Sequence, residues 1–291
     1  MLDVRRLRLL RDLAQHGTIA AVAAAHTYTP SAVSQQLAAL EREAGIALLE
    51  RTGRRVTLTP AGRTLVTHAE EVLAALERAA AALAAGRDGL SGPLRIGAFP
   101  TAMRTLLPPA LVALSEAHPR LELSVHELDP AVVPQLLRDD ALDVALVHDY
   151  DLVPIEPDPA LRTLPLLDET ISVAALGPRR LTECRDQPWI LASPGTLCHT
   201  MTVRACEAAG FSPRVRHHAD DFVTVLTFVA AGQGVALIPE LAATDVPAGV
   251  VLTPLDTRRR TRLAFRAGAA EHPAVTAFAD ALGITRGRQR H

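Results

Sequence analysis

Two cysteines are the side chains of this sequence whose type and spacing most directly suggest chemistry. Cys198 and Cys206 are separated by seven residues. They lie near the predicted start of a helix, where the local field would lower the pKa of a thiol and make it reactive. Such a pair could serve a thiol-based redox sensor. The alternative is that both thiols are buried and inert.

A second chemical pattern is His217-His218-x-Asp220-Asp221. Metal ligands must converge on one point, but adjacent histidines at the end of a strand point to opposite sides, so we expect neither a metal site nor a cofactor. The sequence contains no nucleophile elbow, phosphate-binding loop or dinucleotide fingerprint. We therefore expect no enzyme. An enzyme or a bare solute-binding protein in the C-terminal part is the alternative of another class.

Arginine supplies all 30 basic side chains, and 32 acidic residues leave a formal net charge of −2. The whole chain is therefore not basic enough to indicate nucleic-acid binding. Residues 1–86 differ, because they hold ten arginines against eight acidic residues. Within them, Arg51, Arg54, Arg55 and Arg63 form a cluster without an acidic residue. Such a cluster fits a DNA-contacting surface or an ordinary solvated surface.

Three short helices must position the first part of this basic segment. Apolar spacing predicts them over residues 2–16, 19–25 and 30–44. Thr18 and Thr29 are suitable N-caps, Pro30 suits a first helical position, and Gly45 ends the third helix. In that third helix the inward positions are Val33, Leu37 and Leu40, and the outward positions are Ser31, Ser34, Gln35 and Ala38.

A wing and a long helix follow. Residues 46–58 fit a two-stranded wing with its turn at residues 52–55, and Thr59 with Pro60 marks the start of another helix. In this helix apolar residues alternate four and three positions apart, at Leu65, Ala69, Val72, Leu76, Ala79 and Leu83. The heptad spacing predicts dimerisation through a paired helix. The alternative is a helix that packs on its own domain.

Beyond a glycine-containing hinge at residues 86–92, strands alternate with helices. The strands are expected at residues 94–99, 121–128, 144–147, 171–175, 189–191, 215–217, 235–238 and 263–265. Helices are expected between most of them, for example at residues 106–117 and 132–138. This alternation predicts an α/β fold with a largely parallel sheet.

Several stretches together resemble LysR-type transcriptional regulators. The front stretches are GTIAAVAAA (17–25), SAVSQQLAALE (31–41), GIALLER (45–51) and LTPAG (58–62). The later ones are PLRIG (93–97), LDVA (142–145) and AGQGVALIP (231–239). The resemblance covers almost the whole chain, and Leu49 replaces a phenylalanine that the family usually has. It also extends to CEAAG (206–210), which is similar to the region around the resolving cysteine of peroxide-sensing members, although the cysteine spacing here is one residue shorter.

The resemblance implies which residues contact DNA. A winged helix-turn-helix places its recognition helix in the major groove. The matching positions imply base-edge roles for Pro30, Ser31, Ser34 and Gln35, and the glutamine amide could pair with adenine. Arg54, at the tip of the wing, matches a position that enters the minor groove. Arg51 fits either a phosphate contact or a structural ion pair.

The resemblance also implies a two-lobed, periplasmic-binding-protein-like domain that holds a small-molecule effector between its lobes. Ligands of such sheets bind beyond the carboxyl ends of strands, often at helix N-termini. Two such ends are expected here, and they favour a small polar or carboxylate effector whose identity the sequence does not reveal. The expected effector-binding residues are Pro100, Thr101, Ala102, His148, Ser193, Thr196 and Phe222.

These expectations define a multidomain α+β and α/β chain. Its parts are a DNA-binding domain (1–58), a linker and dimerisation helix (59–87) and an effector-binding domain (88–291), with lobe I at about 92–163 and 267–291 and lobe II at about 164–266. The expected partners are a double-stranded DNA operator with an interrupted dyad, the effector, a second copy in a dimer or tetramer, and RNA polymerase. With no signal peptide or membrane span expected, we predict a soluble cytoplasmic protein.

Overall fold

The computed structural model describes residues 1–52, 55–86, 89–154 and 157–284. Contacts divide the chain into an N-terminal unit and a C-terminal unit. The N-terminal unit comprises Met1–Gly86 with Ala267–His272, and the C-terminal unit comprises Arg87–Arg266 with Pro273–His291. None of the described helices combines the length and the hydrophobicity needed to cross a membrane.

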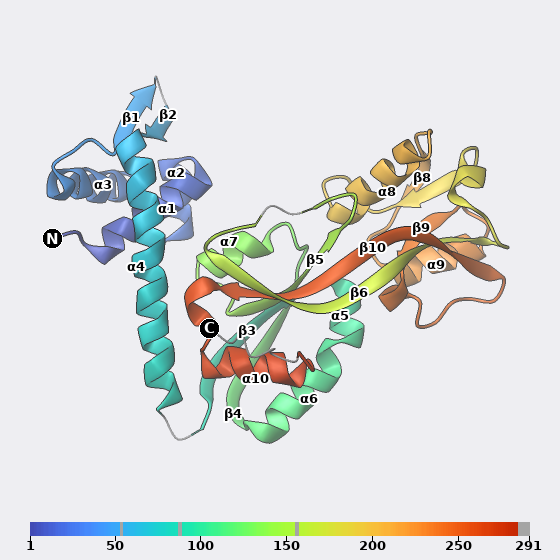
Figure 1. The fold of residues 1–291 in the computed structure, drawn as a ribbon. Coiled ribbons are helices and arrows are strands. Elements are labelled where there is room, and N and C mark those ends of the chain that lie inside the picture. Colours follow the sequence, from blue (N-terminus) through green and yellow to red (C-terminus); the bar gives the residue numbers. More distant parts are fainter. Residues whose placement is uncertain (53–54, 87–88, 155–156, 285–291) are drawn as a thin grey trace. The chain divides into compact units, whose positions relative to one another are not determined.

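The three predicted helices of the N-terminal unit are confirmed. They are α1 (Val4–His16), α2 (Ile19–Ala25) and α3 (Pro30–Ala44) (Figure 1). Thr18 and Thr29 cap α2 and α3, since their Oγ1 atoms accept the backbone N–H groups of Ala21 and Ala32. Gly45 ends α3 in the left-handed conformation, with φ 69°, which glycine adopts without steric cost.

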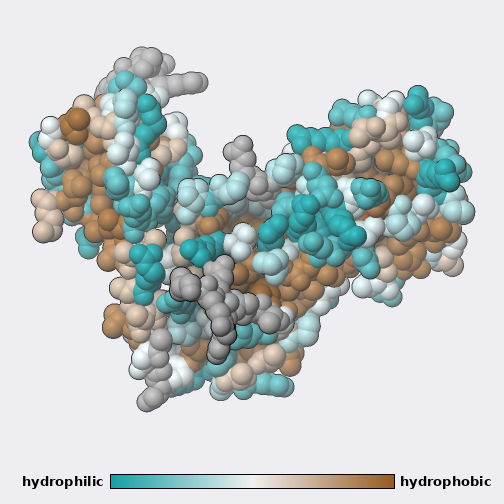
Figure 2. Space-filling view, viewed as in Figure 1, coloured by the Kyte–Doolittle hydropathy of each residue, from teal (hydrophilic) through white to brown (hydrophobic). Residues whose placement is uncertain are grey.

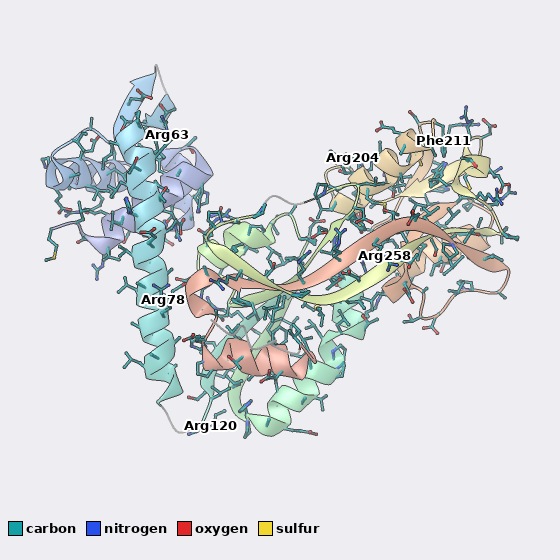
Figure 3. The ribbon with its side chains drawn as sticks, viewed as in Figure 1. Arg63, Arg78, Arg120, Arg204, Phe211 and Arg258 are labelled. Carbon is teal, nitrogen blue, oxygen red and sulfur yellow. The ribbon has the colours of Figure 1, made fainter. Side chains whose placement is uncertain are left out.

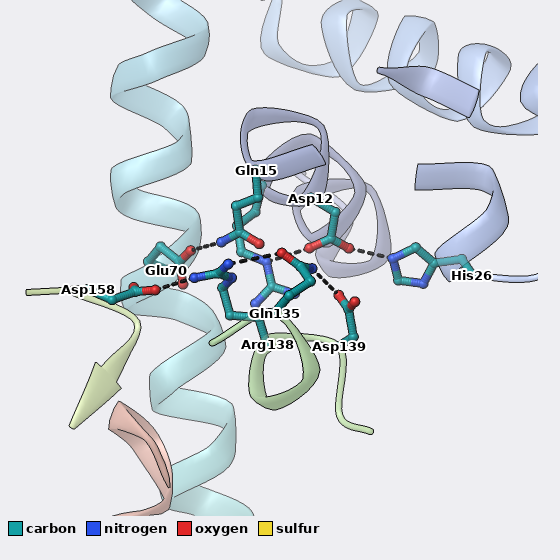
Figure 4. A network of polar contacts seen from close by, with 9 residues as sticks. Asp12, Gln15, His26, Glu70, Gln135, Arg138, Asp139 and Asp158 are labelled. Carbon is teal, nitrogen blue, oxygen red and sulfur yellow. Dashed lines mark hydrogen bonds and ion pairs between the residues drawn. The ribbon is translucent and has the colours of Figure 1, made fainter. Parts of the chain in front are cut away.

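The core of this unit is made by the inward faces of its helices. Val33, Leu37 and Leu40 of α3 are buried, as predicted, and pack with leucines of α1 and with Val22 of α2. One buried carboxylate supplements this apolar core. Asp12 accepts hydrogen bonds from Arg11 Nε at 2.6 Å and lies 2.5 Å from His26 Nε2 (Figure 4). This contact ties α1 to the end of α2.

The wing is a hairpin of β1 (Leu49–Thr52) and β2 (Arg55–Leu58), in which Leu49 pairs with Leu58. It leads into α4 (Pro60–Ala85), capped by the Thr59 hydroxyl, which accepts the Gly62 N–H at 3.0 Å. A Cβ atom at Gly62 would lie 2.2 Å from the Leu48 carbonyl oxygen. Glycine is therefore required where α4 starts against the hairpin.

The heptad positions of α4 fall into two groups. Leu65 and Ala69 pack into the core of the N-terminal unit, as the alternative interpretation expected. Val72, Leu76, Ala79 and Leu83 are exposed instead, and Leu83 retains 75% of its accessible surface. The first part of the helix therefore belongs to its own domain, whereas the second part presents an apolar stripe that no residue of the described chain covers.

The C-terminal unit is built on a six-stranded sheet with the order β4-β3-β5-β10-β6-β9. The strands are β3 (Ser91–Ala98), β4 (Arg120–Glu127), β5 (Val144–Tyr150), β6 (Leu161–Leu176), β9 (Ala236–Pro239) and β10 (Val250–Arg266). β3 pairs parallel with β4 and β5, whereas β10 pairs antiparallel with β5 and β6, and β6 with β9. Two further strands, β7 (Pro188–Leu191) and β8 (Arg214–His218), pair parallel.

The expectation of a largely parallel sheet is therefore wrong, because the sheet is mixed. Segments 171–175 and 263–265 are parts of strands of 16 and 17 residues that run antiparallel to each other. Charged residues in the middle of β10 hide this length in the sequence. Arg260 and Arg262 both pair with Asp149 of β5, at 3.0 and 3.2 Å. Hydrophilic residues accordingly gather over the middle of this unit (Figure 2), where Arg258 lies on β10 (Figure 3).

Helices flank the strands in two lobes joined by β6 and β10 (Figure 1). The first lobe carries α5 (Pro100–Thr105), α6 (Leu107–Ala117), α7 (Val133–Arg138) and α10 (Pro273–Ala281). The second lobe carries β7, β8, α8 (Leu197–Ala208) and α9 (Phe222–Ala230). Val133 and Leu137 of α7 pack in a core of the first lobe, and Trp189 is buried in a core of the second. The helices predicted at 106–117 and 132–138 are thus confirmed as α6 and α7.

Candidate functional site

The first turns of α3 form an exposed surface opposite its buried face. Pro30, Ser31 and Gln35 are exposed and Ser34 is half-buried. Among the described residues no hydrogen bond holds the Gln35 amide, whereas the neighbouring Gln36 accepts a hydrogen bond from Arg6 Nε at 2.9 Å. Gln35 therefore presents both its donor and its acceptor to whatever approaches the helix.

The structure describes part of the arginine cluster near the wing. Arg51 lies on β1 opposite Val56, and Arg54 lies outside the described residues. Arg63, near the start of α4 (Figure 3), donates from Nη1 to the Leu58 carbonyl at 2.7 Å. Arg63 therefore has a structural contact that braces the hairpin against α4.

The C-terminal unit contains a cavity of about 240 Å³ between its two lobes. Five of the expected effector-binding residues line it: Pro100, Thr101, His148, Thr196 and Phe222. Four of these stand at helix starts: Pro100 and Thr101 in the first turn of α5, Thr196 as the N-cap of α8, and Phe222 as the first residue of α9. Ala102 and Ser193 do not line the cavity. Ala102 is fully buried, and Ser193 donates from its backbone N and its Oγ to Asp220, both at 2.7 Å.

A buried ion pair lies at the base of this cavity. Arg259 of β10 is 0% exposed, and its Nε donates to Glu169 Oε1 of β6 at 2.7 Å. Its Nη2 donates to Thr101 Oγ1 at 3.3 Å, and its guanidinium lies 5.0 Å from the centroid of the Phe99 ring. Glu169 Oε2 in turn accepts the Leu241 N–H at 2.6 Å. The pair therefore links a helix start of the first lobe to a backbone group of the second.

Neither member of this pair was predicted from the sequence. The signal that could have found Arg259 is the two-residue alternation of a strand. Thr257, Arg259 and Thr261 are buried, whereas Arg258 is exposed and Arg260 is partly exposed. A run of arginines conceals that alternation, because hydrophobicity no longer marks the inward positions.

His148 forms a neutral part of the wall. Burial lowers the pKa of His148 well below its usual value, and the charge of Arg259 lowers that pKa further. Its ring lies edge-on to Phe99 and Tyr150, with centroid distances of 4.6 and 5.1 Å. Among the described residues its Nδ1 has no hydrogen-bond partner. His148 is therefore uncharged at neutral pH, and its Nδ1 atom is unpaired among the described residues.

The thiols behave differently from the expectation. Cys198 lines the cavity, and its Sγ lies 3.1 Å from Tyr150 Oη. Burial raises the pKa of Cys198, and burial raises that of the fully buried Cys206 to about 12. The expectation of a lowered thiol pKa is thus wrong, because removal of the thiolate from water outweighs the position of Cys198 in the first turn of α8.

Carboxylates line the same cavity from both lobes. Glu127 and Asp129 lie at and just after the end of β4, and Asp220 lies just before α9. These three carboxylates are not among the residues that the sequence predicted to bind the effector. Next to the cavity, Arg104 of the first lobe pairs with Asp221 of the second, Nη1 to Oδ1, at 2.7 Å. Among the described residues no three histidine, cysteine or carboxylate groups are arranged to hold a metal ion.

Comparison with known proteins covers both units. Residues 4–63 match the family described as bacterial regulatory helix-turn-helix protein, lysR family, and residues 87–284 match the LysR substrate binding domain. A probable hydrogen peroxide-inducible genes activator of Mycobacterium avium is 33% identical over 81% of this chain and 77% of its own length. The transcriptional dual regulator GltC of Bacillus subtilis is 28% identical over 88% and 87%.

Solved structures agree with this similarity. A cysteine mutant of OxyR from Corynebacterium glutamicum is 27% identical, with a TM-score of 0.55, over 97% of this chain and 91% of that one. A full-length OxyR variant from Pseudomonas aeruginosa shares the fold, with a TM-score of 0.61 at 22% identity over 100% and 99% of the two chains.

Proposed function

The chain belongs to the LysR family of DNA-binding transcriptional regulators, and on that premise we propose how its parts divide the work. It is a regulator of transcription rather than an enzyme. We assign DNA recognition to residues 1–58, pairing of two chains to residues 59–87 and effector binding to residues 88–291. The effector is a small molecule that binds in the cavity between the two lobes.

DNA recognition is assigned to Pro30, Ser31, Ser34 and Gln35, with Arg51 and Arg54 of the wing on the adjacent backbone and minor groove. The observation that carries this assignment is the contrast between the two faces of α3. One face of α3 is buried in the core. The residues of its first turns on the opposite face are exposed, and Gln35 has no hydrogen-bond partner among the described residues. Small residues beside Gln35 allow the helix to approach base edges closely.

The test is a nuclease footprint and gel shift on the DNA upstream of the protein's own gene. We expect protection of an interrupted dyad, because a twofold pair of reading heads binds two half-sites. Folded protein that protects no specific site there, or in a genome-wide selection, would contradict the assignment.

Pairing of two chains is assigned to the exposed stripe of α4. We expect Leu76→Glu to weaken self-association at least tenfold, because the carboxylate would be buried against the partner helix. The measurement is size-exclusion chromatography with light scattering over a dilution series. Arg78→Glu is the matched control, since Arg78 is exposed on the same helix (Figure 3) but outside the stripe. Equal association of both variants and the unaltered chain would exclude this stripe as the interface.

The remaining partners follow from these assignments. We propose that the dimer assembles further into a tetramer through the effector-binding domains and that it acts on transcription through RNA polymerase. Because the protein acts by binding an operator on the chromosome, we place its action in the cytoplasm. The effector would favour one arrangement of the lobes, and it can do so only if its affinity differs between the two arrangements.

Thiol-based sensing is the second candidate function. Two observations favour it: several relatives are hydrogen peroxide-inducible genes activators, and Cys198 lines the cavity beside Tyr150. Both cysteines lie on α8, about 12 Å apart along the helix axis, so a disulfide between them requires α8 to unwind. Peroxide treatment followed by peptide mass spectrometry would then reveal a Cys198–Cys206 disulfide, and a gel shift would reveal altered DNA binding. The raised thiol pKa values predict slow oxidation instead. Thiols that stay reduced, with DNA binding unaltered, would eliminate this candidate.

A further inference from the structure

The walls of the effector cavity carry an excess of negative charge. Glu127, Asp129 and Asp220 line it, and among its described lining residues Arg259 is the one with a positive side chain. The positive charge of Arg259 is already matched by Glu169 at 2.7 Å. The side chain of Arg259 is also almost wholly inaccessible, which leaves little of it for a ligand. The charged side chains among the described lining residues are therefore three carboxylates and one arginine that is already paired.

Two of these carboxylates are held in place from opposite lobes. Asp220 accepts hydrogen bonds from the backbone and side chain of Ser193 in the second lobe. Asp129 of the first lobe accepts the Ala131 N–H at 2.8 Å. Burial raises the pKa of Cys198, the Tyr150 hydrogen bond and the charge of Arg259 lower it, and the charges of Asp129 and Asp220 raise it. Both carboxylates therefore act on the same end of the cavity, from two sides.

The lining fits an organic cation better than a metal ion. The carboxylates do not converge with other ligands into a metal-binding cluster within the described residues. The cavity also has apolar walls, including Phe99, Leu128 and Phe222, and aromatic faces attract cations. His148, which is 3% exposed, contributes a neutral ring to the same wall, and its Nδ1 atom is itself buried.

We infer that the effector carries a protonated amine on a small apolar body, and that this amine binds between Asp129 and Asp220. The inference rests on the proposed role of the cavity and replaces the carboxylate that the sequence favoured. The same charges also explain how binding changes the arrangement of the two lobes. Without a cation the two carboxylates repel each other across the lobes, whereas a bound ammonium group attracts both and favours a closed arrangement.

A matched set of four-carbon probes tests the charge preference. Butylammonium and 1-butanol differ only in the head group, and butanoate has the same number of carbon atoms but a chain one methylene shorter. Binding of each probe to the full chain is measured by ligand-observed NMR at physiological salt. We expect butylammonium to bind about tenfold more tightly than either of the others. Asp129→Asn and Asp220→Asn should each reduce its affinity several-fold. Asparagine at position 129 retains an oxygen for the Ala131 N–H, and at position 220 it retains one for the Ser193 N–H while its NH2 group can donate to Ser193 Oγ. Glu116→Gln is the control, because Glu116 is exposed on α6 and does not line the cavity.

The outcomes separate this inference from the proposed function. Butanoate that binds in the cavity as tightly as butylammonium would leave the cavity as the effector site and overturn the amine. Binding of no probe, or binding that persists unchanged in a Phe222→Trp variant that fills the cavity, would overturn the cavity itself and the amine with it. If Glu116→Gln lowers the affinity for butylammonium as much as the two cavity variants do, the effect comes from the overall charge of the protein. That result would overturn the inference as well.

A second readout requires no ligand. Iodoacetamide is neutral, and its rate of reaction with Cys198, followed by peptide mass spectrometry at pH 8, reports the fraction of thiolate. We expect the Asp129→Asn and Asp220→Asn double variant to react several-fold faster than the unaltered chain, because two negative charges near the thiol are removed. Thermal unfolding verifies that the variant remains folded. An unchanged rate in a folded variant would show that these carboxylates do not set the potential of the cavity, and would overturn the inference.

Discussion

Glu169→Gln should lower the free energy of unfolding of the C-terminal unit by about 3 kcal/mol, because it leaves a buried guanidinium without its counter-charge. The side chains of Arg259 and Glu169 are 1% and 2% exposed, so water cannot compensate. Glutamine retains one oxygen for the Leu241 N–H, but its NH2 group then faces Arg259 Nε, so the loss combines the charge with one hydrogen bond. Urea unfolding measured by tryptophan fluorescence reports this unit, since Trp189 is the one tryptophan of the sequence and is fully buried in the second lobe.

Two further variants define what the result means. Arg104→Gln breaks an ion pair whose side chains are both 43% exposed, and its expected cost is below about 1 kcal/mol. The double variant Glu169→Leu with Arg259→Met should recover most of the stability lost in Glu169→Gln, because an apolar pair of similar volume needs no counter-charge. A loss in Glu169→Gln no larger than that in Arg104→Gln would show that the buried pair contributes little.

Gln35→Ala should reduce affinity for the operator by at least about 30-fold. One bidentate contact to a base edge contributes about 1–3 kcal/mol of discrimination, and a dimer makes that contact in both half-sites. The gel shift is run at one fixed salt concentration on the footprinted site and on random DNA of the same length. Binding to random DNA depends mainly on contacts with phosphates, which Gln35 does not supply in this assignment. Affinity for random DNA should therefore stay nearly unchanged.

Gln36→Ala is the matched control for this experiment. Gln36 is the next residue of α3, but its side-chain oxygen is bonded to Arg6, so its truncation should leave specific binding within about threefold, a difference of well under 1 kcal/mol. If Gln35→Ala and Gln36→Ala weaken binding equally, or if Gln35→Ala weakens binding to random DNA as much as to the operator, the amide of Gln35 reads no base.

The local elements were predictable because their signals are local. Thr18, Thr29 and Thr59 cap the helices that the spacing of apolar residues predicts, and a cap depends only on residues within one turn. The exposed face of α3 follows from the same periodicity. The helix starts that meet at the cavity were also recognisable, because each directly follows a strand or a short loop after one.

The parts that sequence could not predict depend on partners far away in the chain. Arg259 and Glu169 are 90 positions apart, and nothing near either residue shows that the other will neutralise it. The same limit applies to the reactivity of Cys198. Its position at the start of a helix is visible in the sequence, but its removal from water is not, and removal from water determines the direction of the pKa change. The sign of charge in the cavity likewise depends on Asp129 and Asp220, which only the fold brings to one place.

The two long strands that join the lobes also constrain how the molecule can move. β6 and β10 are paired antiparallel from one lobe to the other, with interruptions only near Pro254 to Arg258 and at Thr261 to Arg262. A ribbon of this kind resists stretching, since lengthening it breaks hydrogen bonds. As long as these hydrogen bonds hold, the two lobes can change their relative orientation by twisting or bending the ribbon, but they cannot move apart along it.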